Sequence, residues 1–146
     1  MQGDWTMTRD ELRTRRLSMG KTQRQLADLM GISLRAVHSF EQGWRKIPIH
    51  VERQVYFLAM LARRLSRPAA VCWQVRRCPV QVRRRCPAWE LKAGQFCWFI
   101  SGTLCQGASR QSWKAKMAIC RRCAVFLGAV GPGTPSGDSM PGDAVA

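Results

Sequence analysis

Apolar residues recur at helical spacing in four successive segments of the first 62 residues. Thr8, Thr22 and Ser33 each precede one of the first three segments, and each is a residue type that caps a helix N-terminus. Pro48, which suits the first turn of a helix, precedes the fourth. The pattern therefore predicts four consecutive amphipathic helices. Their apolar faces comprise Leu12 and Met19, then Leu26, Leu29 and Met30, then Ala36, Val37 and Phe40, and finally Val51, Val55, Leu58 and Ala62.

A tight turn is predicted between the second and third helices, at Gly31. Glycine adopts a positive φ at little cost, so the chain can change direction sharply there. Ala27 is small enough to let the next helix approach closely, and Val37 supplies a branched core residue. This combination, between Thr22 and Gly43, is typical of a helix-turn-helix, which places its second helix in the major groove of DNA.

Residues from about 7 to 62 resemble the Xre or phage-repressor family of helix-turn-helix domains. The matching segments are TQRQLADLMGIS, AVHSFEQG and WRKIP. The resemblance implies binding to double-stranded operator DNA, usually as a homodimer, and a role in transcription. The family commonly adds a fifth helix for packing or dimerisation, whereas Arg67-Pro68 interrupts this chain soon after the predicted fourth helix.

The same resemblance assigns roles to individual residues. Thr22 and Gln23 are expected to contact phosphate, and Arg45 and Lys46 to contact the DNA backbone. Arg35 is expected to bind guanine, because its guanidinium can donate to O6 and N7 together. Two alternatives stay open: Arg35 contacts only phosphate, or His38 is merely exposed. Glu41 is expected to brace the fold from within, because it would repel phosphate. The predicted DNA-binding residues are Thr22, Gln23, Ser33, Leu34, Arg35, His38, Ser39, Arg45 and Lys46.

A formal charge of +15 and a pI near 11 predict attraction to polyanions such as nucleic acid. The excess is greatest in residues 67–127, where twelve basic residues accompany a single acid, Glu90. Three interpretations of the arginines in this segment stay open. They offset the charge of a thiolate site, they add phosphate contacts beside the helix-turn-helix, or they form a solvated basic surface.

All seven cysteines fall between Cys72 and Cys123. The N-terminus lacks the features of a signal peptide, so we expect a cytoplasmic protein with reduced thiols. The odd number of cysteines also argues against a scheme built only of disulfides. Metal binding, through zinc or an iron–sulfur cluster, and thiol redox chemistry are both open. The candidate ligands are Cys72, Cys78, Cys86, Cys97, Cys105, Cys120 and Cys123, of which only the last two have the two-residue gap typical of one metal.

Residues 72–126 resemble the bacterial two-CW domain, through the segments CWQVRRC, CPAW, FCWFISGTLCQG and KMAICRRCAVF. The resemblance implies a small cysteine-rich module of signalling and regulatory proteins, with no defined ligand. Trp73, Trp98 and Trp113 are expected to belong to its core, because a small module needs large apolar side chains.

The sequence thus predicts a mainly α protein: a four- to five-helix repressor-like bundle in residues 1–66, a linker in 67–71, an irregular cysteine-rich module in 72–127 and a disordered tail in 128–146. The favoured function is a sequence-specific transcriptional regulator with a metal- or redox-responsive module. The alternatives are a metal-cluster electron-transfer protein and a zinc-stapled protein-interaction adaptor. Scarce histidines and acids argue against an enzyme, and no apolar run is long enough to span a membrane. No small-molecule substrate is evident.

Overall fold

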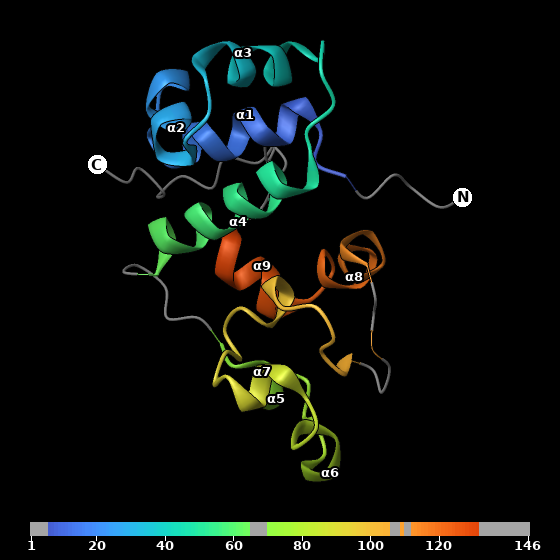
Figure 1. Ribbon diagram of the computed structural model, residues 1–146. Coiled ribbons are helices and arrows are strands. Elements are labelled where there is room, and N and C mark those ends of the chain that lie inside the picture. The colour runs from blue at the N-terminus through green and yellow to red at the C-terminus, as the bar shows by residue number, and fades with distance from the viewer. Residues whose placement is uncertain (1–5, 65–69, 106–108, 110–111, 132–146) are drawn as a thin grey trace.

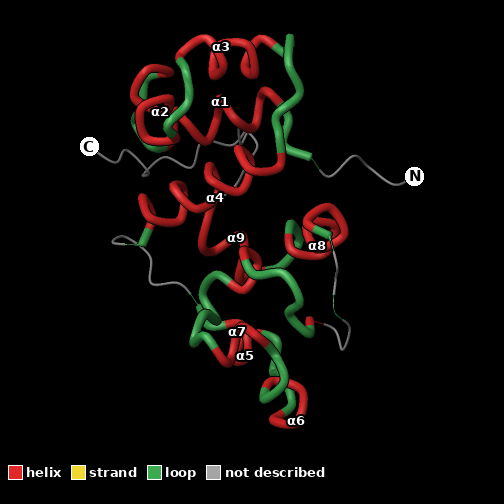
Figure 2. The backbone as a smooth tube through the Cα atoms, in the orientation of Figure 1, coloured by secondary structure: helices red, strands yellow, loops and turns green. Residues whose placement is uncertain are grey.

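The computed structural model describes residues 6–64, 70–105, 109 and 112–131, which form helices and connecting loops (Figures 1 and 2). These residues contain no strand, in agreement with the predicted mainly α class. The elements are α1 (Arg9–Ser18), α2 (Gln23–Met30), α3 (Leu34–Gln42), α4 (Ile49–Arg63), α5 (Cys72–Val75), α6 (Val80–Arg83), α7 (Pro87–Glu90), the 3-10 helix η1 (Cys97–Phe99), α8 (Trp113–Cys120) and α9 (Ala124–Val130).

The first three helices begin at the predicted caps. The hydroxyls of Thr8, Thr22 and Ser33 accept hydrogen bonds from backbone N–H groups three residues later, at 3.0–3.1 Å. At Thr22 the capping box is complete, because the Gln25 side chain accepts from the Thr22 N–H at 2.9 Å. Gly31 ends α2 with φ at +66°, as the tight turn requires.

Helix α4 is buried on more than the one face that its sequence predicts. Val51 and Val55 are buried as expected, but Ala62 at the end of that face is exposed. Glu52 and Tyr56, which lie outside the predicted apolar face, are also fully buried. The reason is that the chain after residue 72 covers this side of α4, so a single hydrophobic cluster runs from Leu12 in α1 through α4 to α8 and α9.

The extra helix against α4 comes from the end of the chain. Helix α9 packs on α4 more extensively than any other helix does, and the two lie side by side in Figure 1. Ala129 and Val130 are buried there, so residues 128–130 belong to a packed helix and not to the disordered tail that the sequence predicts. Residues 67–69 of the predicted linker, and 132–146 of the predicted tail, lie outside the described residues.

A buried polar network joins the two halves of the chain. The Glu11 carboxylate accepts from Arg15 Nε and from the Tyr56 hydroxyl, at 3.0 and 3.1 Å. Arg121, in the loop between α8 and α9, pairs with Glu11 at 3.0 Å and lies 3.6 Å from a Glu52 oxygen. Arg121 thus links the second half of the chain to acids of α1 and α4, and its removal would deprive these buried carboxylates of a charge partner.

Candidate nucleic-acid interface and cysteine cavity

Helix α3 lies at one end of the molecule, with α5, α6 and α7 at the opposite end (Figure 1). Its apolar side is fixed by Val37 and Phe40, which are 1% and 3% exposed. The three predicted contact residues on its other side, Leu34, Arg35 and His38, are exposed, whereas Ser39 is half-buried. The helix therefore presents a cation and an imidazole outward, on a base that the core holds rigidly.

The predicted phosphate contacts surround the first turns of α2 and α3. Thr22 and Ser33 are exposed, and Gln23 is half-buried. Both hydroxyls already accept a cap hydrogen bond, but a hydroxyl that accepts can still donate its own proton to a phosphate oxygen. The first N–H groups of a helix lack acceptors within it, which makes the start of α2 suited to binding an anion.

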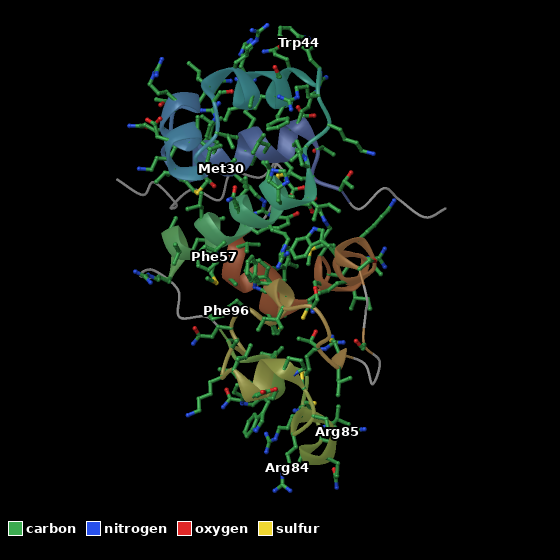
Figure 3. All side chains as sticks on the ribbon, viewed as in Figure 1. Met30, Trp44, Phe57, Arg84, Arg85 and Phe96 are labelled. Carbon is green, nitrogen blue, oxygen red and sulfur yellow. The ribbon has the colours of Figure 1, made fainter. Side chains whose placement is uncertain are left out.

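The loop after α3 continues this surface with Trp44, Arg45 and Lys46, all exposed. Trp44 is 70% exposed, and its ring contacts that of His38 edge to face, with centroids 5.4 Å apart. Figure 3 shows it at the α3 end of the molecule. Arg45 lies over the Phe40 ring at 5.2 Å. Trp44 is not among the site residues that the sequence predicts. The sequence feature that could have indicated Trp44 is its position between Gly43, which ends α3, and the two cations Arg45 and Lys46.

Glu41, the sole acid of α3, is withdrawn from this surface into an ion pair. Arg16 of α1 donates to both carboxylate oxygens, at 2.9 and 3.0 Å, and the paired side chains are only 10% and 3% exposed. Arg16 also donates to the Lys21 carbonyl at 2.9 Å. The predicted role of Glu41 as an internal brace is confirmed. The exposed side of α3 consequently carries no negative side chain, as phosphate binding requires.

A cavity of about 540 Å³ occupies the opposite end of the molecule. It lies among α5, α6, α7 and the segment from Cys97 to Cys105, and Trp73 and Trp89 wall one side with ring centroids 4.8 Å apart. Arg83 lies over Trp89 at 4.6 Å. Five of the seven predicted metal ligands line the cavity: Cys72, Cys78, Cys86, Cys97 and Cys105.

Close backbone contacts fix the shape of this cavity. The Cys72 N–H donates to the Gly94 carbonyl at 2.8 Å, which ties the start of α5 to the loop before η1. A side chain at residue 94 would place its Cβ 2.5 Å from Val71 and 2.6 Å from Trp73, so only glycine fits there. Across the cavity, the Leu104 N–H donates to Cys86 Sγ at 3.4 Å.

The cavity thiols are electrostatically coupled. A hydrogen bond from Cys97 lowers the pKa of Cys72, against the opposing effects of burial and of charge on Cys86, Cys105 and Cys78. The same hydrogen bond and burial raise the pKa of Cys97. Burial, followed by charge on Cys86, raises the pKa of Cys78. These thiols line the same cavity, where a charge on one of them disfavours a charge on another.

Cys120 and Cys123, the only closely spaced pair, do not line the cavity. Both are buried in the hydrophobic cluster against α4, and burial raises the pKa of Cys120 to about 12. Arg121 between them turns to Glu11 and Glu52, so it does not offset thiolate charge as one interpretation of the sequence expects. All seven cysteines are free thiols, and no three described His, Cys, Asp or Glu side chains converge on a single-ion position.

The predicted core tryptophans fall into two groups. Trp98 and Trp113 are 0% and 8% exposed and contact Tyr56 of α4, with ring centroids 6.2 Å away in each case. Trp73 is half-buried at the cavity wall. Arg84 and Arg85 lie near α6, at the far end of the molecule from α3 (Figure 3). They are thus remote from the helix-turn-helix and do not extend its surface.

Comparison with known proteins agrees with the geometry of the first half of the chain. Residues 12–51 match a helix-turn-helix family model, which covers α2, the turn and α3 with parts of α1 and α4. No curated protein and no solved structure matches the chain. The family match does not include the cysteine-rich segment, so its resemblance to the two-CW domain stays a prediction. None of the described helices is long and apolar enough to cross a membrane.

Proposed function

We propose that this protein is a sequence-specific, double-stranded-DNA-binding transcriptional regulator, in which α3 enters the major groove. The observation that carries the proposal is the capped α2–turn–α3 unit, which exposes Arg35 and His38 while Glu41 is turned inward. The helix-turn-helix family match over residues 12–51 supports it. The charge of +15 favours association with DNA of any sequence, and the α3 side chains would supply the preference.

Trp44 extends the proposed interface beyond what the family resemblance implies. Its edge contact with His38 restricts the imidazole to one side of α3, and its own exposed ring lies beside the cations Arg45 and Lys46. A side chain held before binding loses less entropy when it contacts a base. We therefore assign Trp44 the role of positioning His38 against the groove.

We further propose that the cysteine-rich part is a metal- or redox-responsive module that acts through α4. Trp98, next to Cys97 of the cavity, is buried against Tyr56 of α4. Arg53 of α4 donates to the Phe99 carbonyl at 3.0 Å and lies 4.5 Å from the Phe99 ring. A change around Cys97 would thus reach α4, which packs against α1 and α2, and these two helices in turn pack against α3. We also propose that the protein is cytoplasmic and that it binds DNA as a homodimer, with one α3 helix in each of two half-sites.

The test compares three arginine or lysine variants on a selected operator and on random DNA, over a series of salt concentrations. Arg35→Ala should weaken operator binding by ~1–3 kcal/mol while affecting random DNA little, because it removes a base contact. Lys46→Ala should weaken binding to both DNAs and reduce the salt slope by about one. Arg84→Ala, which removes the same charge at the far end of the molecule, is the matched control and should leave the preference intact.

Equal losses on operator and random DNA for Arg35→Ala would overturn the assignment of α3 as the helix that binds base edges. An effect of Arg84→Ala as large as that of Arg35→Ala would overturn the placement of the interface at the α3 end.

A further inference from the structure

The cysteine cavity is much larger than a single metal ion requires. Its volume of about 540 Å³ lies within the ~300–1,000 Å³ range of cofactor pockets. Two of its five thiols come from α5 and η1, and the other three come from the segments that flank α6, α7 and η1. This arrangement suits a cofactor with several metal atoms, each bound by a different thiolate.

One zinc ion would require four of these thiols to come together around a single point. Tetrahedral zinc holds four sulfurs at ~2.3 Å, so neighbouring sulfurs lie only ~3.8 Å from one another. Among the described side chains, no three potential ligands converge in this way. In a four-iron, four-sulfide cluster each of the four cysteines binds a different iron, and the ligand sulfurs are correspondingly farther apart.

We propose that the cavity binds a four-iron, four-sulfide cluster, with Cys72, Cys78, Cys86 and Cys105 as the iron ligands and the Cys97 thiol as a hydrogen-bond donor to Cys72. The inference rests on the proposed metal-binding role of the cysteine-rich part and is independent of DNA binding. The four ligands line the cavity from α5, from the turn before α6, from the residue that precedes α7 and from the segment after η1. Cys72 and Cys97 are within hydrogen-bonding distance, so a single corner of the cluster cannot take both.

The surroundings of the cavity complement such a cluster. Four thiolates around a doubly positive core carry a net charge of about −2. Arg76 and Arg83 line the same cavity, and the Arg83 Nε is buried without a hydrogen-bond partner. The Leu104 N–H already donates to Cys86 Sγ, which is the kind of contact that stabilises ligating sulfurs. Trp73 and Trp89 form an aromatic wall of the same cavity.

Cys120 and Cys123 are excluded from the ligand set by their packing. Both are buried on the α4 side, in the hydrophobic cluster, and neither lines the cavity. Their two-residue spacing serves the turn between α8 and α9, where the Cys123 N–H donates to the Cys120 carbonyl at 2.9 Å. They therefore provide matched control positions for the cavity cysteines.

The first experiment measures iron, zinc and acid-labile sulfide in the full-length protein. The protein is purified without oxygen and analysed before and after incubation with ferric iron, sulfide and dithiothreitol. We expect about four iron and four sulfide per chain, with broad visible absorption. Two iron and two sulfide per chain would overturn the four-iron assignment. One zinc ion per chain, without colour, would overturn the cluster but leave the proposed metal-binding module standing. No bound metal would overturn the cluster and the metal-binding module together. Neither result would bear on the proposed DNA binding.

The second experiment assigns the ligands by cysteine-to-alanine variants, with folding checked by circular dichroism. Cys72→Ala, Cys86→Ala and Cys105→Ala should each lose most of the bound iron, and Cys78→Ala should behave in the same way. Cys123→Ala, the matched control, should retain the full iron content. Cys97→Ala should retain iron but shift the visible spectrum, because it removes a hydrogen bond to a ligand. Loss of iron in folded Cys97→Ala or Cys123→Ala would overturn the ligand set.

Discussion

Trp98 offers a direct way to test whether the two halves of the chain share one core. It belongs to the cysteine-rich part, yet it is 0% exposed and its ring contacts those of Tyr56 and Phe126, at centroid distances of 6.2 and 5.4 Å. Trp98→Ala removes this ring from the contact between η1, α4 and α9. If the core is continuous, the variant should weaken α1 and α3 as well as the cysteine-rich part.

The magnitude follows from the burial of this side chain. A large aromatic residue buries ~200 Å², worth ~5 kcal/mol at ~25 cal/mol per Å². Truncation of buried tryptophan to alanine costs ~3–5 kcal/mol in practice. The indole Nε1 of Trp98 is buried without a hydrogen-bond partner, so its removal returns ~1–3 kcal/mol. The net expectation is about 3 kcal/mol, a large fraction of the ~5–15 kcal/mol typical of a domain.

Native-state hydrogen exchange read by mass spectrometry measures this loss peptide by peptide. A loss of about 3 kcal/mol corresponds to about a 100-fold fall in protection, and it should extend to peptides from α1 and α3. Trp89→Ala is the matched control, because Trp89 is 37% exposed and lies outside the central hydrophobic cluster. Unchanged protection of α1 and α3 in Trp98→Ala, with loss confined to α8 and α9, would refute the shared core.

Three further predictions concern the helix-turn-helix and its buried charges. Glu41→Gln should cost ~1.5–3 kcal/mol in urea denaturation, because it breaks a buried bidentate pair with Arg16, and an unchanged midpoint would contradict the brace. Gly31→Ala should cost ~1–2 kcal/mol by thermal denaturation, because φ is +66° there, and a neutral effect would contradict the left-handed turn. Burial raises the pKa of Glu52 above its ordinary 4.5, so the folded state binds a proton more tightly than the unfolded state does. The free energy of unfolding of the wild type, compared with that of Glu52→Gln, should therefore increase as the pH falls from the raised pKa towards 4.5. A difference between the two proteins that does not change with pH would contradict this prediction.

The sequence predicts the first three helices and the turn well, because their signals are local. Thr22 and Ser33 cap helices through atoms three residues away, and Gly31 needs only its own φ. Such features depend on neighbours that the sequence itself specifies. The surface of α3 follows from the same periodicity, with Val37 inside and Arg35 outside.

The packing of the second half could not be predicted in the same way. Nothing in the pattern of α4 indicates that Tyr56 is covered by rings from Trp98, Trp113 and Phe126, because those contacts span more than 40 positions in the sequence. The sequence likewise favoured Cys120-x-x-Cys123 as the metal pair, on spacing alone. The structure instead gathers five cysteines with no regular spacing around one cavity, through hydrogen bonds and turns that only the folded chain brings together.

The proposed function requires α3 to give this protein a preference among DNA sequences. The most direct test is selection of bound fragments from a genomic DNA library at a fixed salt concentration, followed by footprinting of the enriched fragments. We expect one enriched motif, bound ~10³-fold or more tightly than random DNA, with two protected half-sites about one helical turn apart. Uniform recovery of all fragments, with no enriched motif and equal affinity for random DNA, would contradict it.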